Sequence, residues 1–186
     1  MNLISLLYQS VALAFSLLVL PSAQATSFPL QMQGKIVYVD DGDTLVLLDA
    51  QKQQHKIRLT DSDAPESPKE KYKKLGQPYS VVSGRHLAEM AKGRDATAHC
   101  YEYDRHERLV CRVFVDNKDV SLEQIRAGMA WANGANKRYV RDRRAYEYQH
   151  EAKAARRGLW ADPNPVEPWV WRRSCWKEGN CKEAGQ

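Results

Sequence analysis

The chain has 186 residues, with 28 lysines and arginines against 23 aspartates and glutamates, a net charge of +5 and a pI near 9.0. This length favours one globular domain over two, because domains usually run to about 100–200 residues. A basic surface attracts polyanions such as nucleic acid or anionic lipid, but many proteins that bind neither are as basic, so charge alone selects no function.

The first 25 residues resemble a secretory signal peptide. They carry no charged side chain, and their apolar stretch, Val11–Leu20, is short for a membrane span of about 20 residues. The small residues Ala23 and Ala25 suit signal peptidase, although the absence of Lys or Arg before the apolar stretch leaves an uncleaved anchor as the alternative. Cleavage would release a chain starting at Thr26, secreted or periplasmic, with no stable membrane association.

The next part of the chain predicts a meander of three short strands. The predicted strands are Gln33–Val39, Thr44–Asp49 and Gln54–Leu59. The segments between them are turn-like in composition, the first being Asp40–Asp43. A loop rich in serine, proline and lysine follows from Asp61 to Pro78 and ends the meander.

A helix and a second hairpin follow this loop. Ser80 is expected to cap the helix, which ends at Gly93. Two strands, Thr97–Tyr103 and Leu109–Val115, enclose the polar turn Asp104–Arg108 and would close a five-stranded sheet. Five strands with a helix after the third is the order of an OB-type barrel, so the predicted fold class is α+β, a β-barrel plus helices.

Two more helices complete the predicted domain, which covers residues 26–160. The first has Ser121 and Gln124 as a capping box and Gly128 as its stop. The second runs from about Val140 to Arg157. Beyond them, a tail over residues 161–186 is rich in proline and tryptophan, and we expect it to pack across the body of the protein.

An even number of cysteines in an exported protein indicates disulfides. Cys175 and Cys181 bracket a short glycine-containing turn and are expected to pair. Cys100 and Cys111 flank the second hairpin, where they would either pair across it or remain buried thiols. A zinc site is the remaining alternative, but neither spacing fits the close pairs that zinc usually needs.

Acidic residues stand at two strand ends that the meander would bring together. Asp41 and Asp43 lie between the first two predicted strands, and Asp63 follows the third. Carboxylates of Asp43 and Asp63, the carbonyl of Ala64 and water would form an oxygen shell that suits calcium. Taken alone, the Asp-Gly pair is also ordinary hairpin chemistry.

Two arginines are candidates for the same site. Arg58 lies five residues before Asp63, and Arg108 follows the turn of the second hairpin. Converging on a bound metal, they would clamp a phosphate oxyanion, although Arg58 taken alone could instead form a simple ion pair with the carboxylates.

The ordered motifs of the chain are similar to those of the thermonuclease (staphylococcal nuclease-like) family over about Gly34 to Trp160. The motifs are Asp41-Gly42-Asp43-Thr44, Arg58-Leu59, Asp63-Ala64-Pro65-Glu66, Asp104 with Arg108-Leu109, Ala127-Gly128-Met129-Ala130-Trp131, and Glu151-Ala152 through Arg157-Gly158-Leu159-Trp160. The resemblance implies a five-stranded OB-fold barrel with three packed helices.

The resemblance also implies a calcium (Ca²⁺) cofactor and roles for seven residues. The implied metal-binding residues are Asp43 and Asp63 directly, Ala64 through its carbonyl and Asp41 through water. The implied catalytic residues are Arg58, Glu66 and Arg108, with Glu66 either taking a proton from the attacking water or holding that water. The implied reaction is hydrolysis of DNA or RNA to 3′-phosphate ends.

Several positions depart from the family pattern. Ala64 stands where the type member has threonine, but only its carbonyl is needed. The turn before the second catalytic arginine is Arg105–Glu107 instead of the usual Lys, Tyr and Gly, and the aromatic pair after the second helix is missing, with Tyr139 as a candidate substitute. Ser67–Leu75 resembles an extended substrate loop.

Basic residues elsewhere have two interpretations. They would either grip a phosphate backbone or form a solvated surface. The residues are Lys69, Lys71, Lys73 and Lys74 in the loop, and Lys137, Arg138, Arg141, Arg143, Arg144, Lys153, Arg156 and Arg157 near the last predicted helix.

Three functions therefore compete. The first is an exported, calcium-dependent nuclease that acts as a monomer on DNA or RNA. The second is a non-catalytic OB-fold module that binds nucleic acid. The third is an extracellular domain that calcium stabilises without affinity for polyanions.

Overall fold

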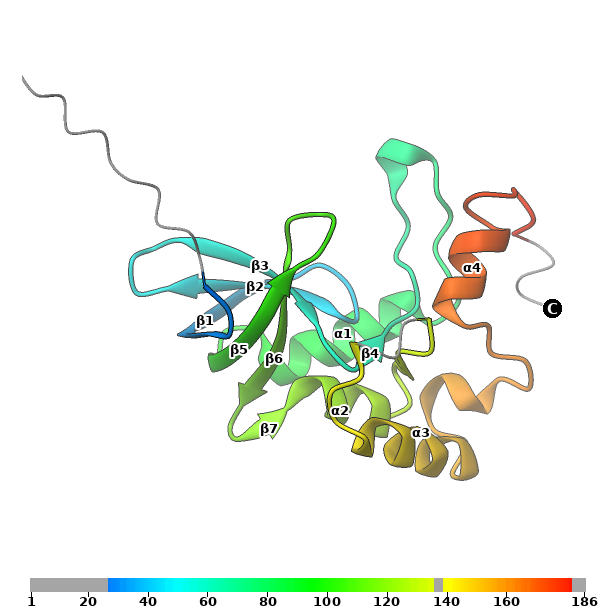
Figure 1. Ribbon diagram of the computed structural model, residues 1–186. Coiled ribbons are helices and arrows are strands. Elements are labelled where there is room, and N and C mark those ends of the chain that lie inside the picture. The colour runs from blue at the N-terminus through cyan, green and yellow to red at the C-terminus, as the bar shows by residue number, and fades with distance from the viewer. Residues whose placement is uncertain (1–26, 136–138, 182–186) are drawn as a thin grey trace, which may run out of the picture.

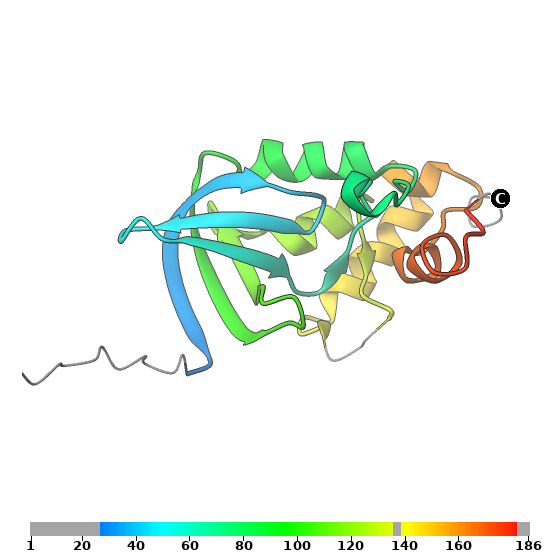
Figure 2. The same cartoon turned by 90° about the horizontal axis from the view of Figure 1, so that it is seen from above.

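The computed structural model describes residues 27–135 and 139–181, so the predicted signal peptide and Lys137 and Arg138 lie outside the described residues. A β-barrel occupies one side of the molecule and the helices pack along the other (Figures 1 and 2). The long strands are β1 (Leu30–Val39), β2 (Thr44–Asp49), β3 (Gln54–Leu59), β5 (Asp95–Tyr103) and β6 (Leu109–Val115). The short strands are β4 (Ser62–Asp63), β7 (Lys118–Asp119) and β8 (Trp131–Ala132).

The helices follow the predicted order, with one addition in the tail. The α-helices are α1 (Ser80–Ala91), α2 (Val120–Arg126), α3 (Arg144–Ala154) and α4 (Pro168–Ser174). Two 3₁₀ turns, η1 (Glu70–Tyr72) and η3 (Gly158–Ala161), lie in the connections. The predicted three helices are therefore present, and a fourth, short helix forms in the tail.

The five long strands close into a mixed barrel. Neighbours in the order β3-β2-β1-β5-β6 are antiparallel, and a parallel pairing of β3 with β6 closes the ring. The predicted five-stranded α+β barrel is thus confirmed. Because Arg58 pairs with Thr44 of β2 and with Val110 of β6, closure brings the starts of β2 and β6 to the end of β3.

Alternating side chains of the strands fill the barrel. Ile36, Leu45, Leu47 and Ile57 are fully buried, and Leu87 of α1 joins the same cluster. Burying one such side chain contributes about 1.5–3 kcal/mol, so the period-two alternation fixes which face of each strand turns inward. This fixed register holds the polar strand ends in place at the rim.

The predicted helix caps are wrong at two helices. Tyr79 precedes α1 as its cap residue and Ser80 is already helical. Asp119 caps α2, accepting hydrogen bonds from the backbone N–H groups of Ser121 and Leu122. Ser121 and Gln124 are fully buried, and their side chains donate hydrogen bonds to distant parts of the chain. The residues that resemble a capping box therefore serve tertiary packing.

The tail packs on the long loop, at the end of the molecule opposite the β2–β3 turn (Figures 1 and 2). The indole N–H groups of Trp171 and Trp176 both donate to the Leu75 carbonyl, at 3.3 and 2.8 Å. Disulfides join Cys175 to Cys181 and Cys100 to Cys111 across β5 and β6. Within the part of the chain that the structure describes, no helix has the length and apolarity to span a membrane.

Candidate active site

The candidate site lies at one rim of the barrel, where β1 turns into β2 and β3 runs into β4. Asp43 ends the first turn, and Asp63 ends β4, whose pairing with Trp131 of β8 fixes its position. The Ala64 N–H donates to Asp43 Oδ2 at 2.7 Å and ties the two segments together. The two acidic strand ends that the sequence predicts to meet do meet.

Gly42 is needed here for close packing. A Cβ at this position would lie 1.9 Å from Ser83 Oγ of α1 and 2.7 Å from the Ala64 Cβ. The Gln124 side-chain amide of α2 also donates to the Gly42 carbonyl at 2.8 Å. The Asp-Gly pair therefore allows two helices to pack closely against the turn, in addition to forming the turn itself.

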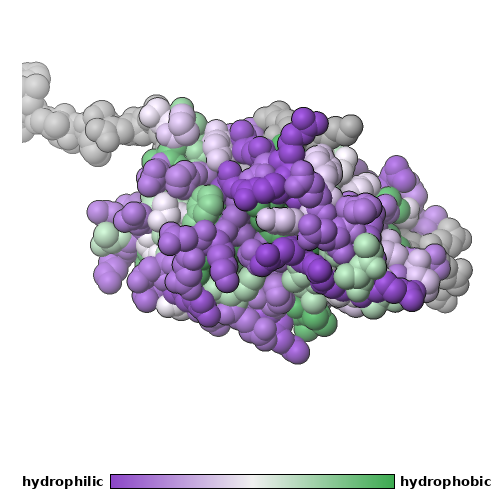
Figure 3. Space-filling view, turned by 90° about the horizontal axis from the view of Figure 1, so that it is seen from below, coloured by the Kyte–Doolittle hydropathy of each residue, from purple (hydrophilic) through white to green (hydrophobic). Residues whose placement is uncertain are grey.

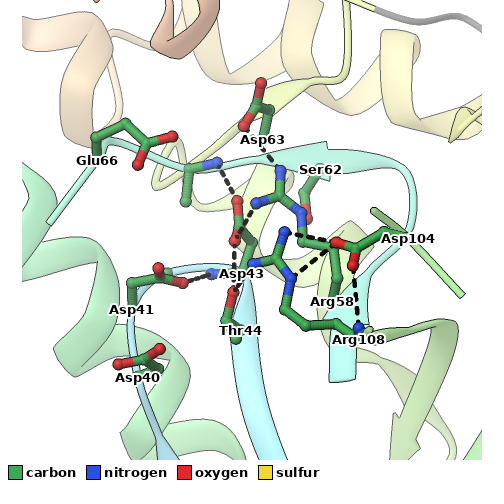
Figure 4. Close-up of polar contacts among 12 residues, drawn as sticks. Asp40, Asp41, Asp43, Thr44, Arg58, Ser62, Asp63, Glu66, Asp104 and Arg108 are labelled. Atoms are coloured by element: carbon green, nitrogen blue, oxygen red, sulfur yellow. Dashed lines mark hydrogen bonds and ion pairs between the residues drawn. The ribbon is translucent and has the colours of Figure 1, made fainter. Parts of the chain in front are cut away.

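Arg58 bridges the two aspartates (Figure 4). Its Nη1 donates to Asp43 Oδ1 at 2.7 Å and its Nη2 to Asp63 Oδ1 at 2.8 Å. Burial alone would lower the pKa of Arg58, but the charges of Asp43 and Asp63 outweigh it and raise that pKa. Arg58 thus remains a fixed cation between two carboxylates.

The same two carboxylates differ in electrostatic environment. Burial raises the pKa of Asp43 well above its ordinary value, opposed by Arg58 and reinforced by the neighbouring charges of Asp41 and Asp63. Burial acts in the same direction on Asp63, but hydrogen bonds and charge from Arg172 and Arg58 outweigh it and lower the pKa of Asp63. An added cation would therefore stabilise the carboxylate of Asp43 more than that of Asp63, because less positive charge lies beside Asp43.

Arg108 is held beside Arg58 by two anchors (Figure 4). Its Nε donates to Asp104 Oδ2 at 2.8 Å, and its Nη1 donates to the Thr44 hydroxyl at 3.2 Å. Thr44 in turn donates to Asp43 Oδ1 at 3.1 Å, so Arg108 is linked to the acidic centre through one hydroxyl. The two predicted arginines converge on one site.

Glu66 and Asp41 flank this centre. Burial raises the pKa of the Glu66 carboxyl, opposed first by the charge of Arg172. The Glu66 backbone N–H donates to Gln77 Oε1 at 3.1 Å. Asp41 accepts from the Asp43 N–H at 3.2 Å, and its Oδ2 lies 3.7 Å from the Lys69 Nζ of the long loop.

The donor set has the chemistry of a hard-cation site. Asp41, Asp43, Asp63 and the Ala64 carbonyl offer only oxygen, the donor that Ca²⁺ prefers. As the side chains stand, however, the described residues contain no group of three or more His, Cys, Asp or Glu side chains close enough to hold a metal ion. Arginines instead neutralise the carboxylates, so a metal would have to share or replace those contacts.

Sequence reasoning missed Arg172 of α4. Its Nη1 and Nη2 donate to Asp63 Oδ1 and Oδ2 at 3.0 and 2.7 Å, and its Nη1 also donates to Glu66 Oε1 at 2.5 Å. The tail sequence contains Arg172 and Arg173 side by side, and no local pattern distinguishes the one that reaches the site. The packing of Trp171 and Trp176 on the long loop helps to orient α4, and it joins segments that lie far apart in the sequence.

Several of the basic side chains near α3 are engaged within the protein. The guanidinium of Arg141 lies 3.9 Å from the Tyr101 ring centroid, and Arg144 pairs with Asp142 at 2.6 Å. Arg157 donates to the Arg126 carbonyl. These contacts favour a structural contribution for this part of the basic segment.

Comparisons with known proteins give one consistent result. Residues 56–162 match the family described as staphylococcal nuclease homologue. An "Uncharacterized endonuclease" from Escherichia coli O157:H7 is 35% identical over 142 residues, 76% of this chain and 85% of that protein. A "Micrococcal nuclease" from Shigella flexneri is 33% identical over 154 residues, 76% of this chain and 81% of that protein.

Proposed function

The chain belongs to the staphylococcal nuclease family, and from this membership we propose that it is an exported, calcium-dependent nuclease that hydrolyses phosphodiester bonds of DNA or RNA. Nuclease activity is the property that the names of the two relatives described above share. Calcium dependence, export and 3′-phosphate products are the finer parts of the proposal.

One observation carries this proposal: two arginines and a glutamate surround two buried aspartates at a single rim of the barrel. Arg58 joins Asp43 to Asp63, and Arg108 reaches the same centre through Thr44. A module that only binds nucleic acid needs positive charge and stacking surfaces, but it has no need to bury this many opposed charges. The arrangement supports charge stabilisation during a reaction.

Asp43 and Asp63 would hold the calcium ion directly, with the Ala64 carbonyl and, through water, Asp41 completing its shell. A bound calcium ion supplies a Lewis acid that polarises a phosphoryl oxygen. Asp43 suits this role because burial and like charges raise its pKa, so a cation relieves an unfavourable field there.

The chain's own residues supply the remaining chemistry. Glu66 takes a proton from the water that attacks phosphorus, and its raised pKa makes it a stronger base than an exposed glutamate. Arg58 and Arg108 donate hydrogen bonds to the phosphoryl oxygens as negative charge grows on them. Cleavage between phosphorus and the 5′ oxygen leaves a 3′-phosphate, and the departing 5′ oxygen takes a proton from solvent to become a hydroxyl.

The test of this mechanism is Glu66→Gln, beside Glu89→Gln on the exposed face of α1 as the matched control. Glu66→Gln keeps size and hydrogen bonding but removes the base, so kcat should fall by about 100-fold or more. Glu89→Gln should cleave like the wild type. Near-normal turnover in Glu66→Gln would refute the assigned role of this glutamate.

The metal and substrate are tested with single-stranded DNA, duplex DNA and RNA, each with calcium, magnesium or chelator. Calcium-dependent cleavage that is lost with chelator, with 3′-phosphate ends on the products, agrees with the proposal. Tight binding without cleavage in every lane would favour the binding module. A melting temperature that rises with calcium, without affinity for polyanions, would favour the structural domain.

Export is tested separately, by N-terminal sequencing of the protein recovered from the periplasm or medium. The expected first residue is Thr26. A protein that retains residues 1–25 and fractionates with membranes would instead support the uncleaved anchor.

A further inference from the structure

The tail brings a third arginine to the candidate active site. Arg172 of α4 lies beyond residue 162, where the family match ends. Its side chain is 28% exposed, whereas the carboxylates that it contacts on Asp63 and Glu66 are 1% and 12% exposed. A charge pair this well buried is held by defined geometry, unlike an ordinary surface ion pair.

Several contacts other than Arg172 anchor the tail at this point. Trp171 and Trp176 donate to the Leu75 carbonyl, and the Trp176 ring lies under the Lys74 ammonium at 4.7 Å. Gln77 donates to the Val166 carbonyl at 2.6 Å while accepting from the Glu66 N–H. The tail and the backbone at Glu66 are therefore held by the same glutamine.

The contacts of Arg172 use the lone pairs that a metal would need. Asp63 Oδ1 accepts from both Arg58 Nη2 and Arg172 Nη1, and Asp63 Oδ2 accepts from Arg172 Nη2. A carboxylate oxygen has two lone pairs, so Oδ1 is fully used and Oδ2 half used. A divalent cation bound by Asp63 would also face the guanidinium charge at close range.

We propose that Arg172 competes with the divalent cation for Asp63, so that the docked tail is an internal inhibitor that metal binding must displace. This inference rests on the proposed function, because it assumes that Asp63 is a metal ligand. Loss of the guanidinium should leave Asp63 with Arg58 as its remaining arginine partner and raise the affinity of the site for calcium.

Arg173 offers a matched control. It is the next residue of α4, its side chain is exposed, and Arg173→Ala removes the same formal charge without touching Asp63 or Glu66. Arg172→Lys is the second test variant, because a lysine ammonium cannot span both oxygens of Asp63 in the bidentate way of arginine.

The experiment is a calorimetric titration of each folded protein with calcium chloride in the absence of nucleic acid. We expect Arg172→Ala to bind calcium about tenfold more tightly than the wild type, with Arg172→Lys in between. Arg173→Ala should stay within about twofold of the wild type. Asp63→Asn should abolish binding, which places the measured event at this site.

The outcomes separate the two proposals. Equal or weaker calcium affinity in both Arg172 variants, with Asp63→Asn still abolishing binding, would overturn the competition and leave the calcium-dependent nuclease intact. An equal gain in Arg172→Ala and Arg173→Ala would also overturn it, because net charge alone would then explain the effect. The absence of calcium binding in every protein would contradict both proposals.

Discussion

At the scale of single residues, Asp104 has two functions, one for each oxygen of its carboxylate. One oxygen holds the Arg108 side chain, and the other stabilises the turn in which Asp104 lies. Oδ2 accepts from Arg108 Nε, whereas Oδ1 accepts from the N–H groups of His106 and Arg108. Asp104→Asn can keep Oδ1 as the acceptor in the turn, but it replaces Oδ2 with an N–H₂ group. This group and the Arg108 guanidinium are both donors, so the hydrogen bond between the two side chains is lost. We expect kcat to fall at least about tenfold with the melting temperature nearly unchanged.

The control for this prediction is Asp116→Asn, which alters an exposed ion pair with Arg94. Kinetics on one DNA substrate and thermal unfolding of both variants are sufficient. An unchanged kcat in Asp104→Asn, or a loss matched by Asp116→Asn, would show that the Asp104 contact does not position Arg108.

The residues that lie at the site were predictable from the sequence where the order of the strands determines which strands pair. Arg58 and Arg108 each lie next to a residue of the β3–β6 pairing that closes the barrel, so their convergence follows from the order of the strands. Arg172 was not predictable, because its position depends on how Trp171 seats on Leu75, a contact between segments 96 residues apart. Local sequence patterns carry no information about such a contact.

At the scale of elements, Asp142 anchors the start of α3. It accepts from the Arg144 N–H at 3.0 Å and pairs with the guanidinium groups of Arg144 and Arg112 at 2.6 and 3.1 Å. The hydrogen bond from Arg144 is the main reason that the pKa of Asp142 falls from 3.8 to about 2. A lowered folded-state pKa stabilises the fold above pH 4, and this contribution is lost as pH falls through about 2.

Asp142→Asn should therefore lower the free energy of unfolding at pH 7 by about 1 kcal/mol, less than the full shift implies, because solvent screens the pair. The deficit should shrink to roughly half at pH 3. Urea unfolding at both pH values measures it, with Asp95→Asn as the control because the Asp95 side chain is 88% exposed. A deficit that is independent of pH would contradict the ion-pair explanation.

Elements were predictable to the extent that hydrophobic alternation fixes them. β2, β3 and β6 have the predicted bounds, whereas β1 starts three residues early because Leu30 already pairs with Cys100 of β5. The predicted start of α3 at Val140 was wrong: α3 begins at Arg144. The N–H groups of Arg141 and Asp142 donate to Asp61 Oδ1, and this tertiary contact takes the preceding residues out of the helix.

At the scale of the whole molecule, charge is expected to govern encounter with the substrate. The net charge of +5 does not depend on residues 1–25, which carry no charged side chain. Hydrophilic residues dominate the face in Figure 3, where apolar residues form only small, separate areas. A polyanion would therefore be attracted mainly through its phosphates, and binding releases counterions from it.

Binding of Glu66→Gln to a fluorescent DNA oligonucleotide, measured between about 50 and 200 mM salt, should weaken log-linearly, with a slope of about −0.7 to −0.9 for each phosphate neutralised. The substitution prevents turnover from distorting the titration. Arg141→Ala serves as the comparison, because Arg141 already contacts Tyr101 and lies 3.6 Å from Glu102, so its loss should hardly change the slope. Affinity independent of salt would mean that base stacking, with little contribution from phosphate charge, holds the nucleic acid. A slope reduced by about one in Arg141→Ala would instead place this side chain on the phosphate backbone and extend the substrate path from the rim of the barrel toward α3.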